Sequence, residues 1–343
     1  MKSSDLALIY LGKRGGGSLL TLQMKLELDG INPFLIVASS NDELENFPSL
    51  EDILTVEIPS KFFYLINPFT MYKIISKIGH ELRLRNVKKA FFVMPHPYDL
   101  FISLLVKKRI TTYHLIHDYP PHPSEIFPGR FFSWLLIKVA HNVVVLSDYV
   151  ASQIKNYLNI SPVRIQFPPY DKSALLKSHD SNFSIYDAKR ILLIGRNSKY
   201  KGIDLGIQSL IESKFSGRVI IAGGLAKNAK VVPEFEFHNG WLTRKELENL
   251  IFNADALFLP YTSATQSGLI PIAIYYNKWI IATDVGALSE QLTDYPNAII
   301  CKTATLKDIT EAINQFDSNA NDLALNRELI NKWSKEFAKE ILL

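Results

Sequence analysis

The amino-acid sequence predicts an α/β protein with two doubly wound domains. Short apolar, β-branched runs alternate with longer amphipathic stretches along the chain, and this alternation indicates parallel sheets with helices on both faces. A Pro-Pro pair and a polar stretch interrupt the pattern around residues 168–187, after which it restarts. A chain of 343 residues is also long for one hydrophobic core. We therefore expect one domain over residues 1–168 and another over residues 188–326.

Each half contains its own series of strands and helices. The strands expected in the first half are residues 6–11, 34–38, 90–94, 112–116 and 142–146, and the helices are 19–28, 70–84, 99–107 and 147–157. The strands expected in the second half are 190–194, 219–222, 256–259 and 280–282, and the helices are 203–212, 244–252, 269–276, 306–315 and 327–343. Because open parallel sheets bind ligands at the carboxyl ends of their strands, the residues that follow each strand are the candidates for a site.

The composition is that of a soluble globular protein, with 47% apolar and 21% charged residues. Cys301 is the only cysteine, which excludes an intrachain disulfide and fits a reducing compartment. No stretch approaches the roughly 20 apolar residues that span a bilayer, and a net charge of +4 is too small to indicate nucleic-acid binding. We expect a cytoplasmic protein.

Residues 61–89 concentrate positive charge. They contain one acid, Glu81, together with seven basic and five aromatic side chains: Lys61, Lys73, Lys77, Arg83, Arg85, Lys88, Lys89, Phe62, Phe63, Tyr64, Phe69 and Tyr72. A basic segment with apolar anchors is typical of contact with an anionic membrane surface. An amphipathic helix with a solvated basic face explains the same pattern, so both interpretations stay open.

The most informative motif is GRNSKYKG, residues 195–202, which follows the apolar run 191–194. It places Arg196 and Lys201 at the exit of a buried strand, directly after Gly195. A guanidinium offers a flat, two-pronged set of donors and an ammonium a mobile point charge, so the pair suits a diphosphate. The alternative is a basic surface loop.

A glycine-rich turn, Gly15-Gly16-Gly17-Ser18, joins the first strand to its helix. Glycines at this position let a ligand approach the backbone amides at a helix N-terminus. A dinucleotide fingerprint would need a third glycine, where the chain has Leu20, and an acid after the second strand, where it has Ser39. A simple tight turn remains the alternative to phosphate or sugar binding.

His117 and Asp118 follow the expected strand 112–116. A histidine at this place can hydrogen-bond a substrate hydroxyl or handle a proton near neutral pH. Capping of the strand is the alternative role for His117. No cysteine or glutamate completes a convincing metal-ligand set with it, so no metal is expected.

The strands of the second half end in further polar or glycine-rich turns. Small hydroxyl residues and a glycine at the start of a helix are typical of a phosphate-binding site. A tryptophan beside a glycine suits the wall of a pocket for the nucleotide base. These candidates are Gly223, Gly240, Trp241, Thr265, Gln266, Ser267, Gly268, Leu269 and Glu290.

The ordered motifs GRNSKYKGID, AGG, NGWLTRKELENLIFNADALFLPY, SGL and IIATDVGALSE resemble the C-terminal half of retaining glycosyltransferase family 4. The glycine-rich turn, His117 and a terminal helix with Trp333 extend the likeness over nearly the whole chain. The resemblance implies the GT-B fold: two Rossmann-like domains that face each other across a cleft, with residues 327–343 returning to the first domain. Relatives with these motifs act in surface-polysaccharide assembly.

The resemblance also implies roles. A nucleotide-diphosphate sugar, UDP- or GDP-linked, would bind the second domain, and a lipid-linked or cell-surface glycan acceptor would bind the first at the inner face of the cell membrane. Arg196 and Lys201 would hold the diphosphate without a metal or other cofactor, and His117 would lie beside the transferred sugar. Further contacts with phosphate, sugar or ribose are implied for Gly16, Gly17, Ser267, Gly268 and Glu290.

One feature departs from the family pattern. The family carries two glutamates eight residues apart, and the corresponding positions here are Thr265 and Ala273. Gln266 is a candidate for replacing one of the lost contacts. The departure leaves two alternatives open: a nucleotide-sugar epimerase with the same fold, or a binding or scaffold protein that has lost catalysis.

Overall fold

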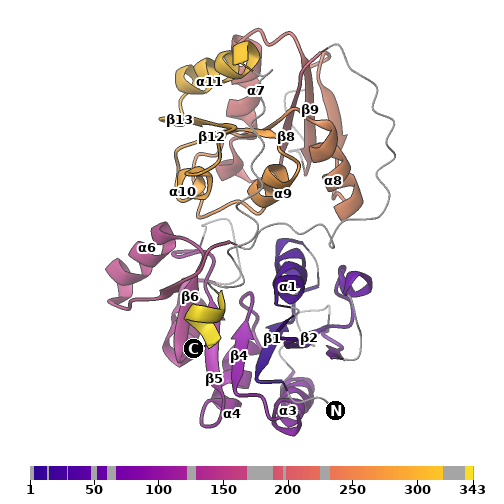
Figure 1. Cartoon of the computed structure of the whole chain (residues 1–343), viewed down its shortest axis with the longest axis vertical. Helices are drawn as coiled ribbons and strands as arrows, with labels where there is room; N and C mark the ends of the chain where they lie inside the picture. The colour runs from indigo at the N-terminus through magenta and orange to yellow at the C-terminus, as the bar shows by residue number, and fades with distance from the viewer. Residues whose placement is uncertain are drawn as a thin grey trace. The chain divides into compact units, whose positions relative to one another are not determined.

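The computed structural model divides the chain into two compact units (Figure 1). Unit 1 is Met1–Ala174 with Asn331–Leu343, and unit 2 is Leu175–Ile330. The structure describes residues 4–13, 15–28, 30–47, 52–59, 67–121, 129–167, 188–195, 198–224, 232–319 and 337–342. Each unit is a parallel α/β sheet covered by helices, as the sequence predicts.

Unit 1 contains a seven-stranded parallel sheet in the order β3-β2-β1-β4-β5-β6-β7. Its strands are β1 (Leu6–Tyr10), β2 (Phe34–Ala38), β3 (Ile53–Val56), β4 (Lys89–Phe92), β5 (Thr111–Leu115), β6 (Asn142–Val145) and β7 (Val163–Arg164). The chain starts in the middle and runs outward to β3, then crosses back to β4 on the other side of β1. This reversal makes the β1–β4 pair the topological switch point, where such sheets bind ligands.

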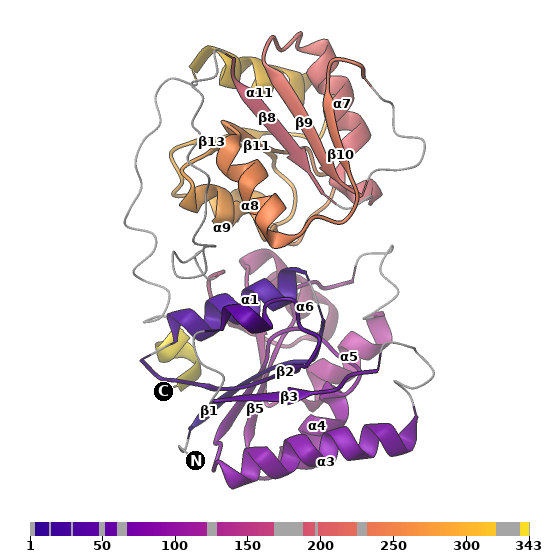
Figure 2. The same ribbon diagram turned by 90° about the vertical axis from the view of Figure 1, so that its right-hand side faces the viewer.

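Helices cover both faces of this sheet (Figure 2). α1 (Gly16–Glu27) packs on one face, where Leu20, Leu22 and Met24 join a core with strand residues such as Leu8. The opposite face carries α3 (Pro68–Leu84), α4 (Asp99–Val106), α5 (Arg130–Val139) and α6 (Asp148–Leu158). Crossover connections between parallel strands are right-handed. A helix whose connection leads toward β3 and a helix whose connection leads toward β7 therefore lie on opposite faces of the sheet.

The C-terminal residues return to unit 1, beside α1. Phe337 and Ile341 are buried in the α1-side core, and the Phe337 ring lies 5.5 Å from that of Phe91 on β4. Lys89 donates a hydrogen bond from Nζ to the carbonyl of Ile341 at 3.0 Å. The final turn, Ala338–Leu342, is therefore held by both apolar and polar contacts.

Unit 2 contains a six-stranded parallel sheet in the order β10-β9-β8-β11-β12-β13, with the β8–β11 pair as its switch point. Its strands are β8 (Arg190–Ile194), β9 (Arg218–Gly223), β10 (Glu236–Asn239), β11 (Ala256–Leu259), β12 (Trp279–Thr283) and β13 (Ala298–Cys301). Its helices are α7 (Ile203–Glu212), α8 (Arg244–Asn253), α9 (Leu269–Tyr275), α10 (Leu288–Leu292) and α11 (Leu306–Asn319). α7 and α11 pack together over one face.

Four strands were not predicted: β3, β7, β10 and β13. They are the outermost strands of the two sheets. β7 has only two residues and β10 is polar and mostly exposed. β3 and β13 are mostly apolar runs of only four residues, which hydrophobic periodicity alone does not assign to a strand. The expected helix 327–343 is described only at residues 337–342, and the polar stretch 168–187 lies outside the described residues.

We expect Phe337→Ala to destabilise unit 1, because deleting a fully buried phenylalanine side chain costs about 3–5 kcal/mol. The measurement is native-state hydrogen exchange of β4 amides. Phe131→Ala, at a ring that is 72% exposed, is the control and should leave exchange unchanged. Equal β4 exchange in parent and Phe337→Ala would show that the C-terminal turn does not support the sheet.

Candidate active site

The candidate residues of unit 2 lie at one edge of its sheet. Gly195 follows β8, Gly223 ends β9, and Gly240 follows β10. Residues 265–269 follow β11, and Glu290 lies on α10 after β12. Since all six strands are parallel, these segments share the carboxyl edge of the sheet, where an open α/β fold binds its ligand.

Gly202 lets the turn that carries Lys201 approach the end of β11. Its φ is +63°, and a Cβ here would lie 1.8 Å from the carbonyl oxygen of Pro260, so only glycine fits. The backbone of Tyr200 accepts a hydrogen bond from the Thr262 amide at 2.8 Å. The turn at residues 199–201 is thereby fastened across the β8–β11 switch point.

Lys201 is held over an aromatic ring at this place. Its ammonium lies 3.8 Å from the ring centroid of Tyr261, which is fully buried, and 5.1 Å from that of Tyr200. A cation over a ring face is stabilised by the ring quadrupole without being neutralised. Among the residues that the structure describes, no carboxylate pairs with Lys201. Its positive charge is thus available at the switch point.

Tyr261 connects Lys201 to the loop after β11. Its hydroxyl lies 3.4 Å from the hydroxyl of Ser267, and the Ser267 amide donates to Oε1 of Gln291 at 2.8 Å. Gln291 lies on α10 and also donates from Nε2 to the Ser267 carbonyl at 3.4 Å. Sequence reasoning did not single out Gln291, because a lone glutamine on a short helix carries no signal of its own.

A second glycine fixes the same loop from the β12 side. Gly286 has a φ of +61°, and a Cβ on it would lie 1.4 Å from the Ala264 carbonyl oxygen. Thr283 adds a hydrogen bond from Oγ1 to the Tyr261 carbonyl at 2.6 Å. The backbone of residues 261–267 is thus fixed by its neighbours from β12 and α10.

The two positions that lack the family glutamates are buried: Thr265 is 6% exposed, and Ala273 is inside the packed face of α9. Beside them, the amide oxygen of Gln266 is buried and makes no hydrogen bond to the described residues. Gly268 is exposed and Leu269 begins α9, while Glu290 is half-buried. Gln266 therefore has a buried acceptor with no hydrogen-bond partner among the described residues.

Gly195, Gly223 and Gly240 lie at the same carboxyl edge of the sheet, on the side of β8, β9 and β10. A Cβ on Gly223 would lie 2.2 Å from the Gly195 carbonyl, and the Gly240 amide donates to the Gly223 carbonyl at 3.1 Å. Trp241 follows Gly240 with 59% of its surface exposed. Arg196 lies outside the described residues, so the predicted pairing of two cations on one diphosphate stays a prediction.

The glycine turn of unit 1 starts α1 beside Tyr10. Gly17 approaches the Tyr10 ring so closely that a Cβ would lie 2.7 Å from it, whereas a Cβ on Gly16 would meet no atom within 4 Å. The Gly15 amide donates to the Asp42 carboxylate at 3.1 Å. A side chain at Gly17 would therefore displace the Tyr10 ring, whereas Gly16 leaves the space next to the helix N-terminus open.

His117 follows β5 in unit 1, at the carboxyl edge of that sheet. Its Nε2 lies 3.2 Å from the Asp118 carboxylate, and both side chains are largely buried. This pairing supports an orienting role for Asp118 on the imidazole. His117, Gly16 and Gly17 all lie in unit 1, and the candidates at the sheet edge described above lie in unit 2.

His96 is a residue that the sequence reasoning missed. It follows β4, so it lies at the switch point of unit 1, and its backbone amide donates to Asp99 at 2.7 Å. Its Nδ1 accepts from the Tyr98 amide at 3.2 Å, which places the proton of a neutral ring on Nε2. Burial, aided by the Lys13 ammonium, lowers the pKa of His96 from 6.5 to about 3. The histidine after the strand in Pro95-His96-Pro97 was the available signal.

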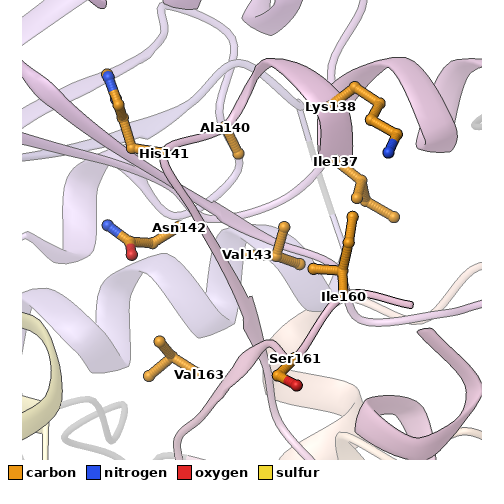
Figure 3. A pocket seen from close by; sticks show the side chains of 9 residues that line it. All are labelled: Ile137, Lys138, Ala140, His141, Asn142, Val143, Ile160, Ser161 and Val163. Carbon is orange, nitrogen blue, oxygen red and sulfur yellow. The ribbon is translucent and has the colours of Figure 1, made fainter. Parts of the chain in front are cut away.

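A shallow pocket of about 310 Å³ lies at the opposite, amino edge of the unit 1 sheet (Figure 3). His141 lies there and binds the Thr112 backbone amide through Nδ1 at 3.0 Å, in a structural role. The pocket is lined by Ile137, Lys138, Ala140, His141, Asn142, Val143, Ile160, Ser161 and Val163. It contains none of the predicted site residues.

No group of three or more His, Cys, Asp or Glu side chains in the described part of the chain is arranged to hold a metal ion. None of the helices described is both long and apolar enough to cross a membrane.

His96 makes the stability of unit 1 depend on pH. Its imidazole is neutral in the folded unit down to about pH 3 but takes up a proton near pH 6.5 when unfolded, so its contribution is lost as the pH falls from about 6.5 toward 3. We expect His96→Gln to reduce this loss of stability. The measurement is urea unfolding of the protein at several pH values, with hydrogen exchange of the unit 1 amides as the readout. Identical pH profiles for parent and variant would contradict the neutral, buried imidazole.

Gly286→Ala should destabilise unit 2 by about 1–3 kcal/mol or more, because the new Cβ clashes with backbone at a left-handed φ. Thermal unfolding measures the effect. Gly16→Ala is the matched control: its Cβ enters open space within a helix, so the transition should stay unchanged or rise slightly. Equal transitions in the two variants would rule out the close approach of Gly286 to Ala264.

Comparison with known proteins finds similarity to glycosyltransferases. Residues 177–336 match the family model "Glycosyl transferases group 1". An uncharacterized glycosyltransferase of Methanocaldococcus jannaschii is 24% identical over 354 residues, which cover 97% of this chain and 92% of the relative.

Solved structures show the same fold. HepE of Anabaena in complex with UDP and glucose gives a TM-score of 0.71 at 12% identity, covering 98% of this chain and 95% of HepE. The lipopolysaccharide outer core galactosyltransferase WaaB in its apo form gives 0.63 at 14% identity, covering 98% and 99%. At such identities the likeness establishes the GT-B fold alone. Together with the match of residues 177–336 to the family model and the glycosyltransferase relative, it indicates that the chain is a glycosyltransferase with the GT-B fold.

Proposed function

We propose that this enzyme transfers a sugar from a UDP- or GDP-linked donor to a lipid-linked or cell-surface glycan acceptor. The observation that carries the proposal is the ammonium of Lys201, fixed over the buried Tyr261 ring at the switch point of the unit 2 sheet. A diphosphate at the carboxyl ends of β8 and β11 would meet this charge. In this proposal residues 188–326 take the donor and residues 1–168 the acceptor.

The cations stabilise the leaving group. As the bond between the sugar C1 and the β-phosphate oxygen breaks, negative charge develops on the departing nucleotide diphosphate, and Lys201 with Arg196 neutralises it. The acceptor hydroxyl forms the new bond to C1 on the same face, and its proton passes to the departing phosphate oxygen. Because charge stabilisation comes from side chains and amides, the proposal requires no metal.

The other candidate residues shape the donor site in this proposal. The loop at residues 265–269 lies next to the phosphate and sugar, with Gln266 offering the buried amide oxygen that makes no hydrogen bond to the described residues. Glu290 lies toward the ribose, and Gly195, Gly223 and Gly240 leave room for the nucleotide. Trp241 is exposed at the same edge and walls the base. His117, with its Asp118 partner, orients the transferred sugar.

The acceptor is proposed from the resemblance and from the basic segment 61–89. WaaB, by its description, acts on the lipopolysaccharide outer core, and a membrane-linked acceptor would bring this enzyme to an anionic surface. Lys61, Phe62, Phe63 and Tyr64 lie outside the described residues, whereas residues 68–84 form α3 with Lys73 and Lys77 exposed. We propose a peripheral location at the inner face of the cell membrane.

Calorimetry with UDP and GDP tests the donor site. The parent protein should bind one of the two, and Lys201→Met, which keeps the apolar stem over Tyr261, should lose binding and about 10²–10³ in transfer rate. Lys199→Met, on the same turn, is the matched control and should bind like the parent. A parent protein that binds neither nucleotide would favour the scaffold alternative. Conversion of a donor sugar without any acceptor would favour the epimerase.

A further inference from the structure

Large apolar side chains are exposed together on two neighbouring helices of unit 1. α4 and α5 pack against each other on the face of the sheet opposite α1 (Figure 2). The α4–α5 surface consists of five exposed apolar side chains: Phe101, Leu104, Leu105, Phe131 and Trp134. Phe131 is 72% exposed, and its ring stacks on that of Trp134 at 5.8 Å. A gathered apolar surface of this kind marks an interaction site, unlike single exposed side chains.

α3 extends this surface on the other side of α4. Gly79 of α3 lies so close to α4 that a Cβ there would be 2.6 Å from Leu105. The N-terminal turns of α3 add the exposed rings of Phe69 and Tyr72. The Lys73 ammonium lies 4.4 Å from the centroid of the Phe69 ring.

The charges around the α4–α5 surface are almost all positive. Exposed basic side chains flank it on all three helices or directly after them: Lys73, Lys77, Arg83, Lys107, Lys108, Arg109, Arg130 and Lys138. The acids of the same segments are withdrawn from it. Glu81 lies 3.7 Å from Arg85, and Asp99 is buried and binds the His96 amide. An apolar centre with a basic rim complements an anionic lipid surface, in which rings enter the acyl boundary and ammonium groups meet phosphates.

We propose that the α4–α5 surface is the membrane-docking face of the enzyme, with Phe131 and Trp134 entering an anionic bilayer and the flanking lysines and arginines contacting its headgroups. Within the described part of the basic segment 61–89, the exposed aromatic side chains are Phe69 and Tyr72 on α3. α4 and α5 supply the apolar part, from residues that sequence analysis did not connect with the membrane. The inference deepens the proposed function, on which its purpose rests, because a lipid-linked acceptor is confined to that surface.

Sedimentation with vesicles tests the proposal without any sugar transfer, so it can fail independently of the proposed activity. The full chain is mixed with phosphatidylcholine vesicles that contain either no anionic lipid or about one third phosphatidylglycerol. We expect binding to the anionic vesicles at about 0.1 M salt that weakens at about 0.5 M. Phe131→Ser with Trp134→Ser should lower the bound-to-free ratio about tenfold or more. Lys107→Glu with Lys108→Glu should also lower it.

Two controls localise the effect. Ile31→Ser in unit 1 and Ile211→Ser in unit 2 remove exposed apolar side chains outside the surface and should bind like the parent. Trp134→Phe keeps the surface apolar, so this variant should still sediment with the vesicles. In the parent protein, brominated acyl chains should quench the fluorescence of Trp134, and the variant should lose this quenching.

Three outcomes would overturn the proposal. One is a parent protein that stays in the supernatant with anionic vesicles at low salt, and another is unchanged binding by the Phe131→Ser, Trp134→Ser variant. The third is a dimer, seen by analytical ultracentrifugation, that this variant abolishes while the parent binds no vesicles. That result would assign the α4–α5 surface to a second copy of the chain.

Discussion

The candidate donor site depends on the stacking of Lys201 over Tyr261. The ring is buried and fixed through its backbone carbonyl by Thr283, and the Lys201 ammonium lies 3.8 Å from the ring centroid. Gly202 makes this contact possible, because any side chain there would strike the Pro260 carbonyl. A single close approach between two loops thus places a cation where the strand order of the sheet reverses.

A close approach of a glycine to a backbone carbonyl also occurs at the neighbouring loop. Gly286 meets the Ala264 carbonyl, and Gln291 holds the Ser267 backbone through two hydrogen bonds. Loops fixed in this way need little rearrangement when a charged ligand arrives, which is the preorganisation that electrostatic catalysis requires.

Unit 1 combines two different surfaces in one domain. Its sheet edge carries His96 and His117, each held by a backbone or carboxylate partner. The helices α3, α4 and α5 present aromatic and basic side chains to solvent. An acceptor with a lipid part would need both: a polar edge for its sugar and a face that stays at the bilayer.

The sequence by itself determined the two parallel sheets, because inner strands are buried on both sides and read as continuous apolar runs. It also predicted the family and the segments that follow each strand. The edge strands β3, β7, β10 and β13 were not predicted, since each has at most four residues and β10 is also polar and mostly exposed. Only the tertiary structure decided the contacts of Gln291 with Ser267 and the exposure of the apolar side chains on α4 and α5, because residues distant in sequence come together there. Hydrogen bonds and exposure are properties of that packing, and no local pattern encodes them.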